Sequence, residues 1–180
     1  MRLIGCWLLA TPALAINAVA QPLGGQFLIY DGQQYQSKDL PLASNSPVPV
    51  REAQRQRDGS YAIPRANDGH FYVQGSVNGF PVLFMIDTGA KFTSIPDRLA
   101  ANAGIRAGRV SDFTTAAGKT QGALATGNTV RVGPFSVLNS TVAIMPRLDA
   151  PLLGVDVLNR FQITTVNGYM LLRVVQPLDE

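Results

Sequence analysis

The segment that most constrains the fold is VLFMIDTGA, residues 82–90, where an uninterrupted apolar run leads into a single acidic residue, Asp87. A strand that is apolar on both faces must be covered on both sides, which favours the centre of a barrel or a dimer interface over a solvated sheet. A carboxylate at the end of such a strand is costly to desolvate unless it accepts hydrogen bonds. Backbone N–H groups of Gly89 and Ala90 can donate these bonds, so we place the candidate chemistry at Asp87.

The rare residue types exclude several classes of site. Cys6, the only cysteine, lies in the N-terminal apolar segment, and His70 is the only histidine, so a Cys–His nucleophile, a Cys/His zinc site and an intrachain disulfide are all excluded. A Ser-His-Asp hydrolase would need His70, but no Gly-x-Ser-x-Gly elbow accompanies it. We interpret His70 as a surface or strand-edge residue, and we expect no metal site. Carboxylates and hydroxyls remain as the reactive groups.

The N-terminal segment, residues 1–20, has the features of a secretory signal peptide. It carries a positive charge at Arg2, an apolar stretch over residues 3–15 and the small-x-small ending Ala18-Val19-Ala20. An uncleaved N-terminal anchor is the alternative, and it would associate the protein with a membrane.

The remaining chain divides into three parts by composition. Residues 21–36 could form a small hairpin around Asp31-Gly32, and residues 37–68 are rich in Pro, Arg and Gln, which predicts a flexible linker. Residues 69–176 are expected to form one β domain. The net charge is +3, but the arginines are scattered and not interleaved with aromatic residues, so no nucleic-acid partner is expected.

Short strands separated by turns dominate the predicted domain. Asn78-Gly79 and Asn167-Gly168 are typical of tight hairpin turns, and a small-residue hairpin tip is expected at residues 116–120. Helical segments are expected at residues 94–104 and 155–161. The expected strands cover residues 73–77, 81–86, 111–115, 122–132, 135–138, 140–145, 162–166 and 169–174.

Three motifs in this order carry a family resemblance. Asp87-Thr88-Gly89-Ala90 follows the apolar strand, Ala116-Ala117-Gly118 lies at the hairpin tip, and Leu152-Leu153-Gly154 precedes the second helical segment. From about residue 69 to 174 the chain resembles the retropepsin-like, single-lobe aspartic peptidases of bacteria. The resemblance implies an all-β fold: a closed acid-protease β-barrel lobe with one or two short helices, working as a symmetric homodimer.

The resemblance also implies roles for individual residues. Asp87 is expected to be catalytic, one copy from each subunit activating a water molecule that hydrolyses a peptide bond. Thr88, Gly89 and Ala90 would support the active-site loop, and Leu152, Leu153 and Gly154 would pack beneath it. The flap would comprise Ala116, Ala117, Gly118 and Lys119. No metal or organic cofactor is implied.

The expected partners are a second copy of the chain and a peptide or protein substrate. The chain contains one Asp-Thr-Gly and no Asp-Ser-Gly, so the second catalytic aspartate should be Asp87 of another copy. With the signal segment, the resemblance predicts secretion across the inner membrane of a bacterium. The protein would then be periplasmic, or membrane-anchored and facing the periplasm.

Lys91 departs from the family pattern, in which a small or hydroxylated residue is more usual after Asp-Thr-Gly-Ala. An ammonium close to Asp87 would lower the carboxyl pKa and disturb a pair that must share a proton, whereas a solvent-facing Lys91 would not. Two alternatives to a peptidase therefore stay open. One is a catalytically silent retropepsin-like module that binds peptides or assembles complexes of the cell envelope, and the other is an unrelated β-barrel binding protein whose Asp87 only caps its own turn.

Overall fold

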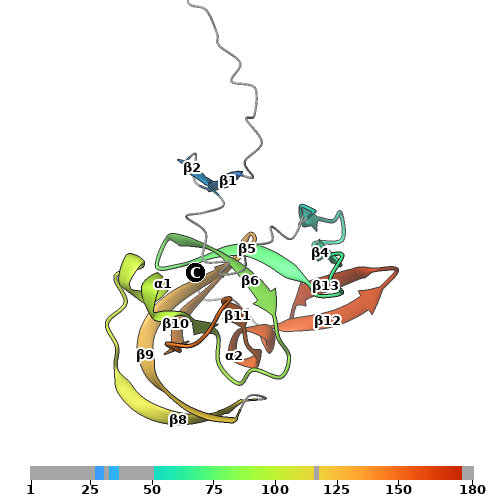
Figure 1. Ribbon diagram of the computed structural model, residues 1–180. Helices are drawn as coiled ribbons and strands as arrows, with labels where there is room; N and C mark the ends of the chain where they lie inside the picture. The colour runs from blue at the N-terminus through green and yellow to red at the C-terminus, as the bar shows by residue number, and fades with distance from the viewer. Residues whose placement is uncertain (1–26, 31–32, 37–50, 116–117, 176–180) are drawn as a thin grey trace, which may run out of the picture.

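The computed structural model of the chain describes residues 27–30, 33–36, 51–115 and 118–175, which form three sheets and two short helices (Figure 1). The strands are β1 (Phe27–Tyr30), β2 (Gln33–Gln36), β3 (Gln54–Arg55), β4 (Tyr61–Pro64), β5 (Tyr72–Val77), β6 (Phe80–Ile86), β7 (Ser94–Ile95), β8 (Arg109–Thr115), β9 (Gly118–Val132), β10 (Phe135–Ile144), β11 (Leu152–Leu153), β12 (Phe161–Val166) and β13 (Tyr169–Val174). The helices are α1 (Asp97–Asn102) and α2 (Val155–Leu158).

The largest sheet closes into a barrel. Its seven strands run in the order β10-β7-β11-β6-β5-β9-β8, and an additional pairing between β10 and β9 closes six of them into a ring, which leaves β8 outside the ring and paired with β9 alone. Strand β9 is 15 residues long and pairs with β5, β8 and β10 along different parts of its length. Closure pairs the six ring strands on both sides, so they have none of the unpaired edges that an open sheet would expose. The predicted all-β barrel with short helices is therefore confirmed.

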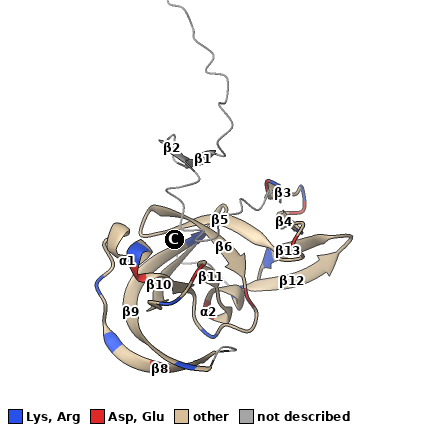
Figure 2. Ribbon diagram, in the orientation of Figure 1, with Lys and Arg blue, Asp and Glu red and all other residues tan. Residues whose placement is uncertain are grey.

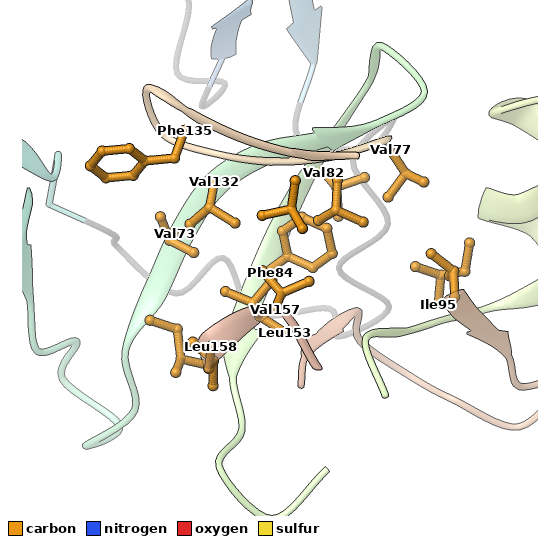
Figure 3. Packing of buried hydrophobic residues seen from close by; sticks show 14 of the residues in the cluster. Val73, Val77, Val82, Phe84, Ile95, Val132, Phe135, Leu153, Val157 and Leu158 are labelled. Atoms are coloured by element: carbon orange, nitrogen blue, oxygen red, sulfur yellow. The ribbon is translucent and has the colours of Figure 1, made fainter. Parts of the chain in front are cut away.

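Strand β6 is buried on both faces, as its uninterrupted apolar sequence predicts. Val82 and Phe84 are fully buried in the main core, and Figure 3 shows Phe84 beside Leu153 and Val157. Leu83 points to the other face and packs in a second cluster with Ala66 and Tyr72. Burial of both faces holds the end of β6, and hence the start of the following loop, in a rigid setting.

The predicted start of the domain at residue 69 is too late, because the four-stranded sheet includes β3 and β4. Its order is β12-β13-β4-β3, and it lies to one side of the barrel (Figure 1). Strand β4 pairs antiparallel with β13, and its Ile63 is fully buried in the main core. The predicted linker over residues 37–68 is thus wrong for residues 51–68, because a distant strand supplies the pairing that their own composition does not suggest. Residues 37–50 lie outside the described part of the chain.

The other local predictions differ from the structure mainly at element ends. The first helix spans only Asp97–Asn102, after Pro96, and β10 is one strand where two were expected. Asn139 adopts a positive φ of 53°, which an Asn side chain tolerates, so the strand is irregular there and continues.

The N-terminal predictions are tested only in part. Strands β1 and β2 pair antiparallel within the segment where a hairpin is expected, and Asp31-Gly32 lies outside the described residues, as does the predicted signal segment 1–20. No helix within the described ranges is both long and apolar enough to cross a membrane.

Candidate active site

Asp87 begins the loop that leaves the end of β6, and its side chain is half-buried. The Gly89 N–H donates a hydrogen bond of 2.8 Å to Asp87 Oδ1. The Ala90 N–H donates instead to the Asp87 carbonyl oxygen, at 3.2 Å, so only one of the two predicted contacts reaches the carboxylate. The tight turn therefore holds one carboxylate oxygen and leaves the other without a hydrogen bond from the described residues.

The apolar-apolar-Gly element supports this loop from behind. Leu152 and Leu153 form β11, which pairs in parallel with the last two residues of β6. The Asp87 N–H donates to the Leu153 carbonyl oxygen at 3.1 Å, and the Val155 N–H donates to the Ala90 carbonyl oxygen at 2.9 Å. Both ends of the turn are thus hydrogen-bonded to β11, which Leu152 and Leu153 form, and to the start of α2, which follows Gly154.

Gly154 is required by the close approach of two backbone segments. A Cβ atom at this position would lie 2.4 Å from the carbonyl carbon of Phe92 and 2.7 Å from the backbone nitrogen of Thr93. Backbone atoms cannot move aside as a flexible side chain could. The Gly154 N–H also donates to Thr93 Oγ1, at 3.2 Å. Any larger residue would push α2 away from the loop that carries Asp87.

Asp156 belongs to the site, although it is not among the residues predicted from the sequence. Its Oδ1 accepts hydrogen bonds from the Thr93 N–H, at 2.8 Å, and from Thr93 Oγ1, at 3.0 Å. Its Oδ2 is buried and has no hydrogen-bond partner among the described residues. Burial raises the pKa of the Asp156 carboxyl, against the opposing effect of the Thr93 hydrogen bonds. The available signal was an acidic residue inside the apolar run LLGVDVL.

The remaining loop residues are accessible. Thr88 and Gly89 are exposed, and Ala90 is half-buried. Lys91 is exposed, and its Nζ lies 5.2 Å from the centroid of the Phe92 ring. Within the described ranges Lys91 forms no ion pair with Asp87. This position agrees with the interpretation of Lys91 as a solvent-facing side chain.

Other candidates lie outside the loop. His70 is exposed, as expected, and its backbone N–H bonds to Asp68. The Asp68 carboxylate also accepts a 2.7 Å hydrogen bond from the Tyr72 hydroxyl. Burial of Tyr72, and to a smaller extent this hydrogen bond, raise the pKa of Tyr72 to about 12.

The part of the chain that the structure describes holds no group of three or more His, Cys, Asp or Glu residues arranged to bind a metal ion.

Strands β8 and β9 form the hairpin expected to contain the flap. They pair from Arg109↔Leu124 to Thr115↔Gly118, and Figure 1 shows the hairpin curving along the left side and the bottom of the domain in that view. Gly118 and Lys119 begin β9, whereas Ala116 and Ala117 lie outside the described residues. A cavity of about 710 Å³ lies between this hairpin and the segment after β10. Its lining residues are Asp112, Phe113, Thr114, Lys119, Thr120, Gln121, Pro146 and Arg147.

Known proteins are similar to the part of the chain that contains the Asp87 loop and the β8–β9 hairpin. Residues 73–160 match the family model described as "gag-polyprotein putative aspartyl protease". The uncharacterized protein RP867 of Rickettsia prowazekii (strain Madrid E) is 32% identical over 108 residues, which cover 58% of this chain and 46% of that protein. The chain therefore spans about half the length of this curated relative. The crystal structure of a retropepsin-like aspartic protease from Rickettsia conorii superposes with a TM-score of 0.54 at 27% identity, covering 68% of this chain and 96% of that one.

Proposed function

We propose that the chain, which matches the family model over residues 73–160 and has the fold of the retropepsin-like aspartic protease from Rickettsia conorii, is an aspartic-type endopeptidase whose catalytic group is Asp87. The observation that carries the proposal is the Asp87 loop itself. A half-buried carboxylate is held through one oxygen by the Gly89 N–H, and β11 and α2 fasten the loop from behind. Such a carboxylate is pre-oriented and forms no ion pair with the described residues, so it is free to exchange a proton with a bound molecule.

Peptide hydrolysis by carboxylates requires two of them. Two carboxyl groups about 3 Å apart cannot both ionise, so one accepts a proton from water while the other, still protonated, polarises the scissile carbonyl. The chain contains one Asp-Thr-Gly loop, and the nearby Asp156 is turned to Thr93. We therefore place the second carboxylate on Asp87 of a second copy, related by a twofold axis.

The four-stranded sheet offers an edge for that second copy. Strand β12 is at the end of the sheet order, and no described strand pairs with its outer side. Val166, at its end, is 43% exposed. Unpaired edges of this kind accept a further strand. Only Asn159 and Arg160 separate β12 from α2, so pairing along this edge would act close to the element that supports the Asp87 loop.

The proposed substrate is an extended peptide bound beneath the β8–β9 hairpin. An extended chain can pair with exposed backbone groups in a cleft, and closure of a hairpin over it would exclude water during the reaction. With the N-terminal segment acting as a signal or an anchor, the domain would operate in the bacterial periplasm or on the periplasmic face of the inner membrane.

A catalytically silent peptide-binding module is the second candidate. The observation in its favour is Lys91, a cation in the loop that carries Asp87, at a position where the family more usually has a small or hydroxylated residue. The two candidates share the fold and the dimer and differ only in turnover.

The test is Asp87→Asn in the full chain, assayed against an unbiased peptide mixture from acid to neutral pH. Asparagine has nearly the size of aspartate and keeps an oxygen that can accept the Gly89 N–H bond, so the fold should be retained while the acid is lost. Cleavage is expected to fall by roughly 100-fold or more. Asp97→Asn, the same change at an exposed carboxylate on α1, should leave cleavage unaltered.

Two results would contradict the peptidase proposal. One is unchanged cleavage in Asp87→Asn. The other is a folded, dimeric chain that binds peptides and turns none of them over, which would establish the silent module instead.

A further inference from the structure

The cavity beside the β8–β9 hairpin has one wall from the hairpin and one from the turn after β10. That turn is well anchored: the Met145 N–H donates to the Ile95 carbonyl oxygen at 2.9 Å, and the Leu148 N–H donates to the Met145 carbonyl oxygen at 3.1 Å. Pro146 and Arg147 lie between these two contacts and are exposed. Arg147 is therefore presented to the cavity by a short, rigid turn.

The charges of the cavity wall are not balanced. It contains two cations, Lys119 and Arg147, and one carboxylate, Asp112. Asp112 Oδ1 accepts a 3.2 Å hydrogen bond from Gln121 Nε2, its partner across the hairpin. Within the described ranges neither Lys119 nor Arg147 forms an ion pair. Figure 2 shows basic residues along the β8–β9 hairpin. The wall thus offers unpaired positive charge beside the apolar surfaces of Phe113 and Pro146.

The cavity is placed where a peptide held by the hairpin would extend. The turn bearing Arg147 leads into Pro151, whose carbonyl oxygen accepts a 2.9 Å bond from the Met85 N–H, and then into β11 beside the Asp87 loop. One wall is therefore continuous with the support of Asp87, and the other wall is the hairpin proposed to close over the substrate. The cavity volume of about 710 Å³ exceeds the volume of any single side chain. Size alone would therefore discriminate weakly between substrate side chains, and their charge would determine which one is preferred.

We propose that this cavity is a specificity subsite for an acidic side chain of the substrate, with Arg147 as the residue that binds its carboxylate. A guanidinium presents paired N–H donors that match the two oxygens of a carboxylate. This inference rests on the proposed peptidase function for its physiological meaning, but the binding it predicts does not require turnover.

The first experiment measures cleavage by the full chain of matched peptides that differ only by Glu, Gln or Lys at positions flanking the cleaved bond. At one position Glu should be preferred to Gln by about five- to tenfold in kcat/KM, the range expected of a partly exposed charge-assisted contact. Arg147→Ala should reduce that ratio to about one, and Arg147→Glu should shift the preference to Lys. Arg106→Ala removes an exposed arginine that does not line the cavity and should leave the ratio unchanged.

The second experiment separates this inference from the proposed function. The Asp87→Asn chain is titrated with the Glu and Gln peptides, and binding is followed by fluorescence anisotropy at low and high salt. A preference for Glu that weakens with salt and is absent in Asp87→Asn with Arg147→Ala supports the subsite even if no peptide is cleaved. Equal affinities for Glu and Gln peptides, or a preference that survives loss of Arg147, would overturn the subsite even if Asp87-dependent cleavage is found.

Discussion

At the residue scale, Asp156 couples α2 to the loop that carries Asp87. One carboxyl oxygen accepts both Thr93 hydrogen bonds, and the other is buried without a partner among the described residues. An ionised carboxylate in that position would be poorly solvated, whereas the protonated acid keeps the Thr93 contacts at lower cost. The residue that organises the back of the site is thus itself sensitive to pH.

This predicts a pH dependence of stability with a defined sign. The folded state raises the pKa of Asp156, so between the unfolded and folded pKa values the folded state binds more protons than the unfolded state. The contribution of Asp156 to stability is therefore fully present below the unfolded pKa and is lost as pH rises through the folded pKa. Urea unfolding at a series of pH values should show this loss, and Asp156→Asn, which does not titrate, should flatten it.

Two comparisons check the assignment. Asp149→Asn changes an exposed carboxyl group and should preserve the slope of the unmodified chain. Asp156→Ala removes the acceptor for both Thr93 bonds and should cost about 1–3 kcal/mol at every pH, because the buried Thr93 N–H is left unpaired. A slope that is the same in Asp156→Asn and in the unmodified chain would assign the pH dependence to another group.

At the element scale, β9 joins the barrel to the hairpin. Its last residues pair with β5 and β10, and its first residues pair only with β8. Asn128 lies between the residues of β9 that pair with β5 and those that pair with β8. It is 5% exposed, accepts a 2.9 Å hydrogen bond from Asn78 Nδ2 and donates one of 2.9 Å to the Ala125 carbonyl oxygen. The pairing of β9 with β10 is irregular near this point. A single buried amide therefore ties the irregular part of β9 to the β5–β6 turn.

Loss of that amide should loosen the hairpin more than the barrel. Asn128→Ala leaves the Asn78 donor and the Ala125 acceptor unpaired, and we expect a destabilisation of about 1–3 kcal/mol. Hydrogen exchange measured by mass spectrometry should accelerate most in residues 118–125, with smaller changes in β5 and β6. Asn102→Ala, at the exposed end of α1, is the matched control and should alter neither quantity. Equal acceleration throughout the barrel would show that Asn128 supports the whole fold and not the junction.

At the scale of the whole molecule, the proposed shared site makes a quantitative prediction for mixtures. If each active site needs Asp87 from both copies, an equal mixture of unmodified chain and Asp87→Asn, after subunit exchange, contains about one quarter unmodified dimers. Its cleavage rate should be about one quarter of that of the same total concentration of unmodified chain. Independent sites would retain about one half.

The dependence of the cleavage rate on protein concentration is the matching control. The rate per subunit should fall on dilution together with the dimer fraction measured by analytical ultracentrifugation, since a separated copy has only one of the two carboxylates. A rate per subunit that stays constant while the dimer dissociates would locate the complete site within one chain.

The local sequence was sufficient to predict the features that depend on the backbone conformation of a few neighbouring residues. The apolar run forms β6 as predicted, and the turn after it gives Asp87 one of the two predicted backbone hydrogen bonds to its carboxylate. The Asn78-Gly79 and Asn167-Gly168 pairs both adopt positive φ angles, as tight hairpin turns require. Strand periodicity and turn preference are properties of neighbouring residues, so one chain segment contains the information needed to infer them.

Which distant segments meet depends on the three-dimensional fold. Composition assigned β4 to a linker, but its pairing with β13, about a hundred residues along the chain, buries Ile63 in the core. Asp156 lacked any turn motif, yet barrel closure places it against Thr93, 63 residues earlier. Burial, pairing partners and the pKa of a carboxyl group depend on how the barrel closes, and no single segment encodes that closure. The sequence therefore determined the catalytic candidate, and the fold determined the residues that hold it in place.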